Sequence, residues 1–276
     1  RSPSRGLGDV YKRQDSDDSI HLQHALSTEV STIDIGHAGT AMRFLVGYFA
    51  SKQNSEVILT GSERMQQRPI GILVEALRDL GADISYEENE GYPPVRIKGK
   101  AITKNNVQIN GNVSSQYISS LILMGTHLAK GVTIELMGKI TSIPYINMTL
   151  SLLNQLGIST HFEGNIIQVL PAKQLQKQTV VVESDWSSAS YFYAVAAFSE
   201  VGSEIQLSAY KKESLQGDSC LAEIYTHFGV ETVFDQNTIT LKKVSASEAG
   251  LLTLDLKNAP DIAQTIAVTC FGLGVT

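Results

Sequence analysis

Hydroxyl and amide side chains gather just before two apolar segments of the sequence. Ser114, Ser115 and Gln116 follow one another before one of these segments, and Ser142 and Tyr145 lie at the start of the other. A single serine at such a position is a preferred N-cap of a helix. Because one helix needs only one cap, the excess of polar groups favours a site for a phosphate monoester, whose oxygens accept several hydrogen bonds at once.

A second set of residues is suited to binding an anion and to accepting a proton. Arg68 lies in the loop 61–71 before a predicted helix, and a guanidinium group binds carboxylate or phosphate through two hydrogen bonds. Gly39 and Thr40 open another helix, where glycine allows close approach of a ligand and the helix dipole attracts anions. Asp261 follows a proline at a helix start, either as a cap or as a base for a bound hydroxyl group.

These helix starts recur at a nearly constant interval. The markers of the four helix starts are Thr40, Ser114, Ser187 and Asp261, and the steps between them are 74, 73 and 74 residues. Glycines that end predicted helices form a second series in phase with the first: Gly81, Gly157 and Gly229. A repeat of this length is a structural unit that stacks on its neighbours to share a core. Each unit of about 74 residues follows a βαβαββ-like order, with one buried and one amphipathic helix.

The polarity of the segments predicts that the helices lie inside the fold. Residues 41–50 and 117–128 are apolar around most of a helical circumference, which is typical of enclosed helices. Turn-forming residues at 88–91, 163–165 and 235–237 indicate hairpins, and therefore mixed sheets instead of a doubly wound parallel sheet. We predict an inside-out α/β repeat fold, with buried helices and mixed sheets outside.

Composition excludes several classes of protein. A hydrophobic content of 42% with 18% charged residues is typical of a globular chain. No apolar run reaches the roughly 18–20 residues of a membrane span. The formal net charge of −6 argues against nonspecific binding of nucleic acid. Two cysteines 50 residues apart favour a reducing compartment over a disulfide or zinc framework, and without a targeting signal we expect a cytoplasmic location.

Six segments together resemble the 5-enolpyruvylshikimate 3-phosphate synthase family of carboxyvinyl transferases. In chain order they are GHAGTAMRF, LTGSERMQQRPIG, GNVSSQYISSLIL, SIPYINMTL, ESDWSSASYF and NAPDIAQTIAV. The resemblance extends from about Asp15 to the end of the chain. A related family transfers the enolpyruvyl group to UDP-N-acetylglucosamine and typically carries a reactive cysteine in the arginine-bearing loop. The corresponding loop, residues 61–71, has no cysteine here, which favours the shikimate enzyme.

The resemblance implies transfer of the enolpyruvyl group of phosphoenolpyruvate to the 5-hydroxyl group of shikimate 3-phosphate, with release of phosphate. It places against shikimate 3-phosphate the residues Ser114, Ser115, Gln116, Ser142, Tyr145 and Asp261. It places at the phosphoenolpyruvate site, where glyphosate competes in this family, the residues Gly39, Thr40, Arg68 and Gln116. Asp261 would be the catalytic base that accepts the proton of the 5-hydroxyl group. No metal or organic cofactor is implied, and a monomer is expected.

The resemblance also implies two domains with the substrates in the cleft between them. We expect residues 1–14 to be a non-native or disordered tail, residues 15–181 to form the first domain and residues 182–276 the second. Family segments at both ends are not found, so this chain alone is expected to be inactive or nearly so, with apolar helix faces exposed after about Val181. The alternative is a non-catalytic protein that binds a phosphorylated ligand.

Overall fold

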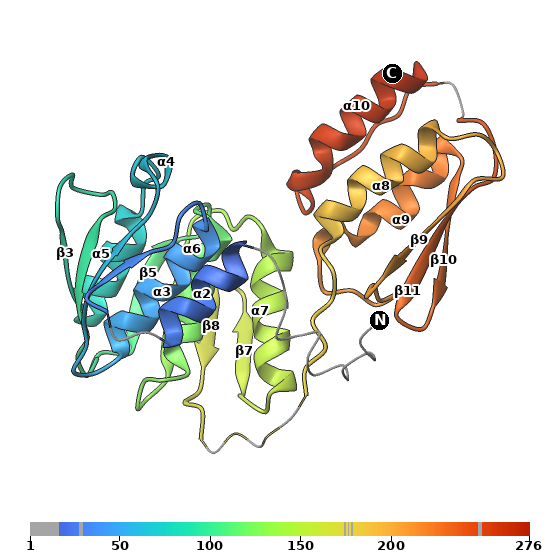
Figure 1. The fold of residues 1–276 in the computed structure, drawn as a ribbon. Helices are drawn as coiled ribbons and strands as arrows, with labels where there is room; N and C mark the ends of the chain where they lie inside the picture. The colour runs from blue at the N-terminus through green and yellow to red at the C-terminus, as the bar shows by residue number, and fades with distance from the viewer. Residues whose placement is uncertain (1–16, 28–29, 174, 176, 178, 248–249) are drawn as a thin grey trace, which may run out of the picture. The chain divides into compact units, whose positions relative to one another are not determined.

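The computed structural model describes residues 17–27, 30–173, 175, 177, 179–247 and 250–276 (Figure 1). The predicted tail, residues 1–14, lies outside these residues. The chain divides into two compact units, Arg1–Ile140 with Thr149–Lys177 and Thr141–Met148 with Gln178–Thr276. We describe each unit by itself. The domain limits expected from the sequence stay a prediction.

Two sheets of the first unit share one topology. The first has the order β1 (Thr32–Asp34), β2 (Glu56–Thr60), β4 (Val95–Lys98) and β3 (Asp83–Tyr86). The second has the order β5 (Asn106–Asn110), β6 (Val132–Met137), β8 (Ile166–Val169) and β7 (Thr160–Glu163). In each sheet the first pair is parallel and the other two pairs are antiparallel. The predicted repeat and its mixed sheets are therefore confirmed.

The helices of the first unit include two that lie side by side in its interior (Figure 1). The helices are α2 (Asp17–Ser27), α3 (Gly39–Ser51), α4 (Glu63–Gln66), α5 (Gly71–Leu80), α6 (Ser115–Gly125) and, from Thr149 on, α7 (Ile143–Gln155). A Cβ on Gly47 of α3 would lie 2.6 Å from the Ser120 hydroxyl oxygen of α6, so the absence of a side chain lets the helices approach closely. The Ser120 hydroxyl donates a hydrogen bond of 2.7 Å to the Arg43 carbonyl. The predicted burial of these helices is confirmed.

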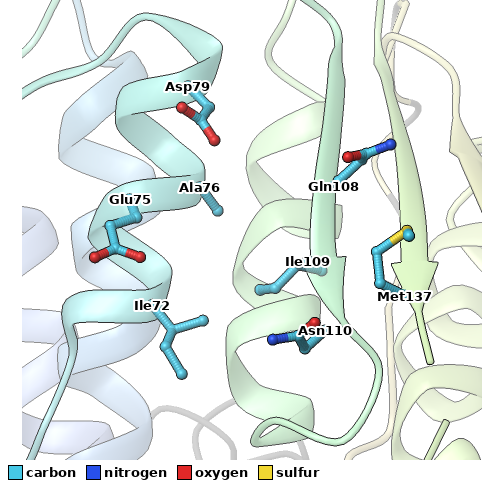
Figure 2. Close-up of a pocket in the computed structure, with 8 residues that line it drawn as sticks. All are labelled: Ile72, Glu75, Ala76, Asp79, Gln108, Ile109, Asn110 and Met137. Carbon is cyan, nitrogen blue, oxygen red and sulfur yellow. The ribbon is translucent and has the colours of Figure 1, made fainter. Parts of the chain in front are cut away.

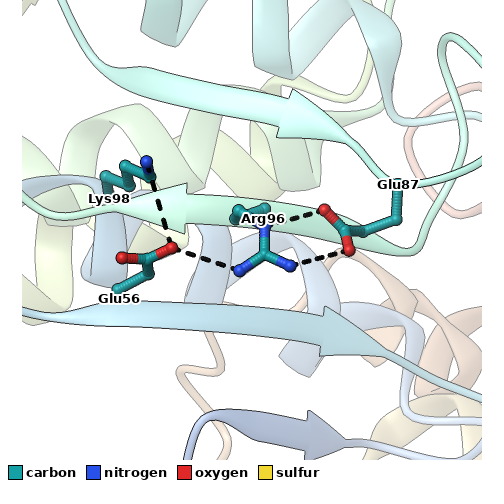
Figure 3. A network of polar contacts seen from close by, with 4 residues as sticks. All are labelled: Glu56, Glu87, Arg96 and Lys98. Carbon is teal, nitrogen blue, oxygen red and sulfur yellow. Dashed lines mark hydrogen bonds and ion pairs between the residues drawn. The ribbon is translucent and has the colours of Figure 1, made fainter.

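The outer face of the first sheet is polar (Figure 3). Arg96 donates to both carboxylate oxygens of Glu87, over 2.8 and 2.9 Å, and to Glu56 over 3.1 Å. The neighbouring strand residues Val95 and Ile97 are fully buried on the opposite face. Alternation along β4 thus turns apolar side chains towards the helices and charged ones outwards, as expected for sheets that lie outside.

The second unit has a three-stranded antiparallel sheet with the order β10 (Val230–Asp235), β11 (Thr238–Lys243) and β9 (Glu204–Ser208). Its longer helices are α8 (Trp186–Phe198) and α10 (Ala263–Leu273), and α7 (Ile143–Gln155) begins in the segment Thr141–Met148. Among the described residues of this unit, no strand precedes α8. The expected amphipathic helix is divided into η1 (Gly217–Cys220), α9 (Leu221–Ile224) and η2 (Tyr225–Phe228). The segment opens with Gly, Asp, Ser and Cys, which form helices weakly.

Apolar residues of the second unit divide between a core and an exposed surface. Its fully buried core contains the aromatic side chains Trp186, Tyr193, Tyr225 and Phe228. Other apolar side chains of α8 and α10 remain exposed, including Tyr191 at 60%, Val268 at 63% and Phe271 at 90%. The expected exposure of apolar helix faces is therefore confirmed.

Helix ends follow the sequence closely. The three predicted cap glycines have left-handed φ values of 106°, 84° and 72°, at Gly81, Gly157 and Gly229 respectively. None of the helices in the described part of the chain combines the length and apolar character that crossing a membrane requires.

Candidate active site

Helix α3 of the first unit begins without a side-chain cap. Its N-cap residue is Ala38, and no acidic residue lies in its first turn. The positive end of the helix dipole is therefore not opposed by a carboxylate on the helix itself. Gly39, the first residue, is buried, and Thr40 is partly buried. This helix start can attract an anion.

Two guanidinium groups converge on this helix start. A Cβ on Gly39 would collide with Nη1 of Arg68 and would lie 2.8 Å from Nη1 of Arg43. Arg43 is only 6% exposed; its Nη1 donates to the Gly39 carbonyl over 2.7 Å, and its Nε has no partner among the described residues. Burial, reinforced by the charge of Arg68, lowers the pKa of Arg43. A bound anion would offset the repulsion between these two positive charges.

Helix α6 carries an amide and two hydroxyl groups at its start. Gln116 Nε2 donates to the Thr40 hydroxyl over 3.1 Å, which joins the starts of α6 and α3. Ser114 is exposed at the N-cap position of α6, but its side chain makes no capping hydrogen bond. Ser115 follows as the first helical residue. The Ser114 hydroxyl is thus not used as a helix cap, in agreement with a role towards a ligand.

A cavity of about 360 Å³ adjoins this cluster and is lined by His37, Arg64, Met65 and Arg68. His37 Nδ1 lies 2.8 Å from the Ser62 hydroxyl, which fixes the imidazole ring against the loop. Two of the four lining side chains carry a positive charge. The cavity therefore suits a small anion.

The second unit brings together two of the predicted residues, Tyr145 and Asp261. Asp261 is exposed in η3 (Pro260–Ile262), and its Oδ2 accepts a hydrogen bond of 3.2 Å from the Tyr145 hydroxyl. Burial, and then the charges of Asp218 and Asp261, raise the pKa of Tyr145 well above its usual range, so Tyr145 acts as a neutral donor. Ser142 precedes α7 with a φ of 55°, and its carbonyl accepts from the Tyr145 N–H over 3.1 Å.

Another cavity of the first unit, of about 290 Å³, has the opposite character (Figure 2). It lies between α5 and the strands β5 and β6, with Glu75 and Asp79 on the helix side and Gln108 and Asn110 on the strand side. No basic side chain lines it. Its carboxylates would repel a phosphate or a carboxylate, so this cavity is not the candidate site.

Arg43 and Asp218 are the two residues of these clusters that sequence reasoning missed. Arg43 lies in an otherwise apolar helix four residues after Gly39, and a charged residue at such a position was the signal that could have found it. Asp218 carries no comparable signal, because its burial results from residues distant in the sequence.

Fold and site together define an α/β repeat protein with interior helices and paired guanidinium groups for a small anion. A sequence model of EPSP synthase (3-phosphoshikimate 1-carboxyvinyltransferase) matches residues 4–273. The chain belongs to this family.

Curated relatives agree with this assignment. Two proteins of Bacteroides fragilis, each named 3-phosphoshikimate 1-carboxyvinyltransferase, are 43% and 46% identical to the chain over 272 and 262 residues. These alignments cover 99% and 95% of this chain but 66% and 63% of the relatives. The solved EPSP synthase of Acinetobacter baumannii has a similar fold, with a TM-score of 0.70 at 22% identity, over 87% of this chain and 54% of that one.

A methyl group at Gly39 tests the anion cluster. The resemblance implies that phosphoenolpyruvate binds at Gly39. On that expectation Gly39→Ala should raise the KM for phosphoenolpyruvate about three- to tenfold, because the new Cβ displaces the guanidinium groups of Arg43 and Arg68. Arg68 is exposed and can move aside, but Arg43 is buried and bonded to the Gly39 carbonyl, so its displacement should also lower the melting temperature. Steady-state kinetics and thermal unfolding of the full gene product measure the two effects. An unchanged KM would contradict the placement of phosphoenolpyruvate at Gly39.

Proposed function

We propose that the protein transfers the enolpyruvyl group of phosphoenolpyruvate to the 5-hydroxyl group of shikimate 3-phosphate and releases inorganic phosphate. The observation that carries the proposal is the convergence of Arg43 and Arg68 on Gly39. The names of the curated relatives support the same reaction. Because the chain spans less than two thirds of their length, the activity is inferred for the complete gene product.

The residues of the first unit have two roles in this proposal. Gly39, Thr40, Arg68 and Gln116 hold phosphoenolpyruvate, whose phosphate and carboxylate groups need hydrogen-bond donors and positive charge. The hydroxyl groups of Ser114 and Ser115, with the Gln116 amide, donate to the phosphate of shikimate 3-phosphate. The fixed donors and the dipole of α3 stabilise the charge that develops during the reaction.

The residues of the second unit complete the binding of shikimate 3-phosphate and supply the base. Ser142 and Tyr145 contact this substrate, and Asp261 accepts the proton of its 5-hydroxyl group as that oxygen attacks C2 of the enolpyruvyl group. A proton added to C3 balances the one taken from the hydroxyl group and gives a tetrahedral phospho-ketal. The bond between C2 and the phosphate oxygen then breaks as a C3 proton is lost, which restores the double bond, and the released phosphate carries the equivalent of the hydroxyl proton.

Phosphate release distinguishes the candidate functions. The full gene product should release phosphate with shikimate 3-phosphate and phosphoenolpyruvate, but not when UDP-N-acetylglucosamine replaces shikimate 3-phosphate. Activity with the UDP-sugar alone would contradict the proposal. Binding of shikimate 3-phosphate without any release would favour the non-catalytic alternative. The 276-residue chain should bind shikimate 3-phosphate but release little phosphate. Titration calorimetry measures the binding, and the same phosphate assay measures the release.

A cytoplasmic location and a monomeric state belong to the same proposal. Neither substrate requires a second copy of the chain in the roles assigned above. Cell fractionation and light scattering of the purified gene product test the two statements. A stable dimer in solution would contradict the second.

A further inference from the structure

Tyr117 is a buried residue of the first unit to which the proposed function gives no role. It follows Gln116 in the first turn of α6 and is only 7% exposed. Its hydroxyl group donates a hydrogen bond of 2.6 Å to the Pro69 carbonyl, 48 residues earlier in the chain. A buried hydroxyl group is costly without a partner, so this bond fixes the Pro69 carbonyl relative to α6.

The Pro69 carbonyl belongs to the short segment that carries Arg68. This segment connects α4 to α5, and both Arg68 and Pro69 are exposed residues. On its far side the Ile70 N–H donates to the Gly91 carbonyl over 2.8 Å. A residue before proline has few allowed backbone conformations, which restricts Arg68 further. The hydrogen bond from Tyr117 therefore ties an already restricted segment to α6.

The ring of Tyr117 lies beside the other guanidinium group of the anion cluster. Cζ of Arg43 is 6.0 Å from the ring centroid, within the range of a cation–π attraction. Arg43 is buried, and its Nη1 donates to the Gly39 carbonyl. A buried cation needs such partners, because it has lost much of its hydration. One residue thus contacts Arg43 through its ring and the segment of Arg68 through its hydroxyl group.

The two guanidinium groups need support to stay together. Nη1 of Arg43 and Nη1 of Arg68 both lie close to the position that a Cβ on Gly39 would occupy, and like charges at close range repel each other. Gln116, the residue before the tyrosine, fastens the start of α3 by donating to a hydroxyl group there over 3.1 Å. The first turn of α6 therefore holds both elements that supply the anion cluster, which are the start of α3 and the segment of Arg68.

We propose that Tyr117 is a positioning residue that keeps the guanidinium groups of Arg43 and Arg68 together at Gly39, ready for a phosphate or carboxylate group. This inference rests on the proposed function, in which that anion is phosphoenolpyruvate. The hydroxyl hydrogen of Tyr117 is already donated to Pro69, so Tyr117 acts through the arginines and not by contact with the substrate. Donors that are held in place bind an anion more tightly, because less conformational freedom is lost on binding.

Phenylalanine at this position removes the hydroxyl group and keeps the ring beside Arg43. In the full gene product we expect Tyr117→Phe to raise the KM for phosphoenolpyruvate about three- to tenfold. The kcat should stay within about twofold of wild type, because the arginines hold the substrate before and during the reaction alike. The affinity for shikimate 3-phosphate should also stay within about twofold. Tyr117→Leu removes the ring as well, so it should raise the KM further and lower the melting temperature.

A double variant shows whether the effect passes through Arg68. In an Arg68→Gln background, Tyr117→Phe should change the KM less than twofold, because the guanidinium group whose segment it holds is gone. Tyr225→Phe is the matched control. Tyr225 is fully buried in the second unit, with its hydroxyl group 2.9 Å from that of Thr269, and loss of this hydrogen bond should leave the KM for phosphoenolpyruvate unchanged.

Three results would overturn the inference: an unchanged KM in Tyr117→Phe, effects of Tyr117→Phe and Arg68→Gln that simply multiply, or an equal rise of KM in Tyr225→Phe. Calorimetric titration with phosphoenolpyruvate alone makes the same comparison without turnover. If the wild-type protein releases no phosphate but Tyr117→Phe still weakens this binding, the proposed function fails and the positioning role stands. The two failures are therefore distinguishable.

Discussion

Replacement of Asp261 by asparagine is expected to lower kcat for phosphate release by about 10²- to 10⁴-fold, the usual contribution of a general base. The amide keeps the size of the carboxyl group and an oxygen that can accept from Tyr145, but it cannot take the proton of the substrate hydroxyl group. Asp261 is exposed, so the change should leave the fold and the affinity for phosphoenolpyruvate nearly intact. Phosphate release and calorimetric titration of the full gene product measure these quantities.

An exposed aspartate from the same region provides the control for this experiment. Asp255 pairs with Lys257 over 2.6 Å, and Asp255→Asn removes the same charge from the segment that leads to Asp261. Its kcat should stay close to wild type. A loss of kcat as large in Asp255→Asn as in Asp261→Asn, or a fully active Asp261→Asn protein, would contradict the assignment of the base.

The fold could be predicted largely because its determinants are local and repeated. Hydrophobic periodicity identified α3 and α6 as enclosed helices. Turn residues identified the hairpin that ends each of the three repeats. Gly81, Gly157 and Gly229 end helical segments in the left-handed conformation that favours glycine. Each of these signals lies within about ten residues of the structure that it specifies, so no tertiary information is needed.

Features that depend on tertiary packing could not be predicted in the same way. Arg43 belongs to the anion cluster only because α3 places it beside Gly39 and the loop returns Arg68 to the same point. The third helix start, that of α8, could be predicted only in part. Asp185 caps α8 by accepting hydrogen bonds from the N–H groups of Ser187 and Ser188, as an ordinary cap does. The Ser187 hydroxyl, however, donates to Asp218, 31 residues further along the chain. Spacing alone identifies a helix start but not the partner of its side chain.

Arg68 should have the second-largest effect, on the affinity for phosphoenolpyruvate. Arg68 is an exposed residue whose guanidinium group lies beside Gly39, whereas Arg43 is buried and bonded to the Gly39 carbonyl. Hydrogen bonds to charged groups contribute about 1.5–3 kcal/mol, so Arg68→Gln should raise the KM for phosphoenolpyruvate about 10- to 100-fold. Arg68→Lys should restore only part of the affinity, because an ammonium group cannot form the bidentate pair.

The role of Arg68 depends on whether Arg68→Gln lowers the affinity for phosphoenolpyruvate alone. The affinity for shikimate 3-phosphate, measured by titration without phosphoenolpyruvate, should stay within about twofold of wild type, because other residues are assigned to that substrate. Arg78→Gln removes one arginine from the same unit at a site paired with Glu90, and it should leave both substrates unaffected. Equal losses for Arg78→Gln and Arg68→Gln would indicate a general effect of net charge. A loss confined to shikimate 3-phosphate would move Arg68 to the other substrate, and the anion that Arg43 and Arg68 jointly hold would then be its phosphate group.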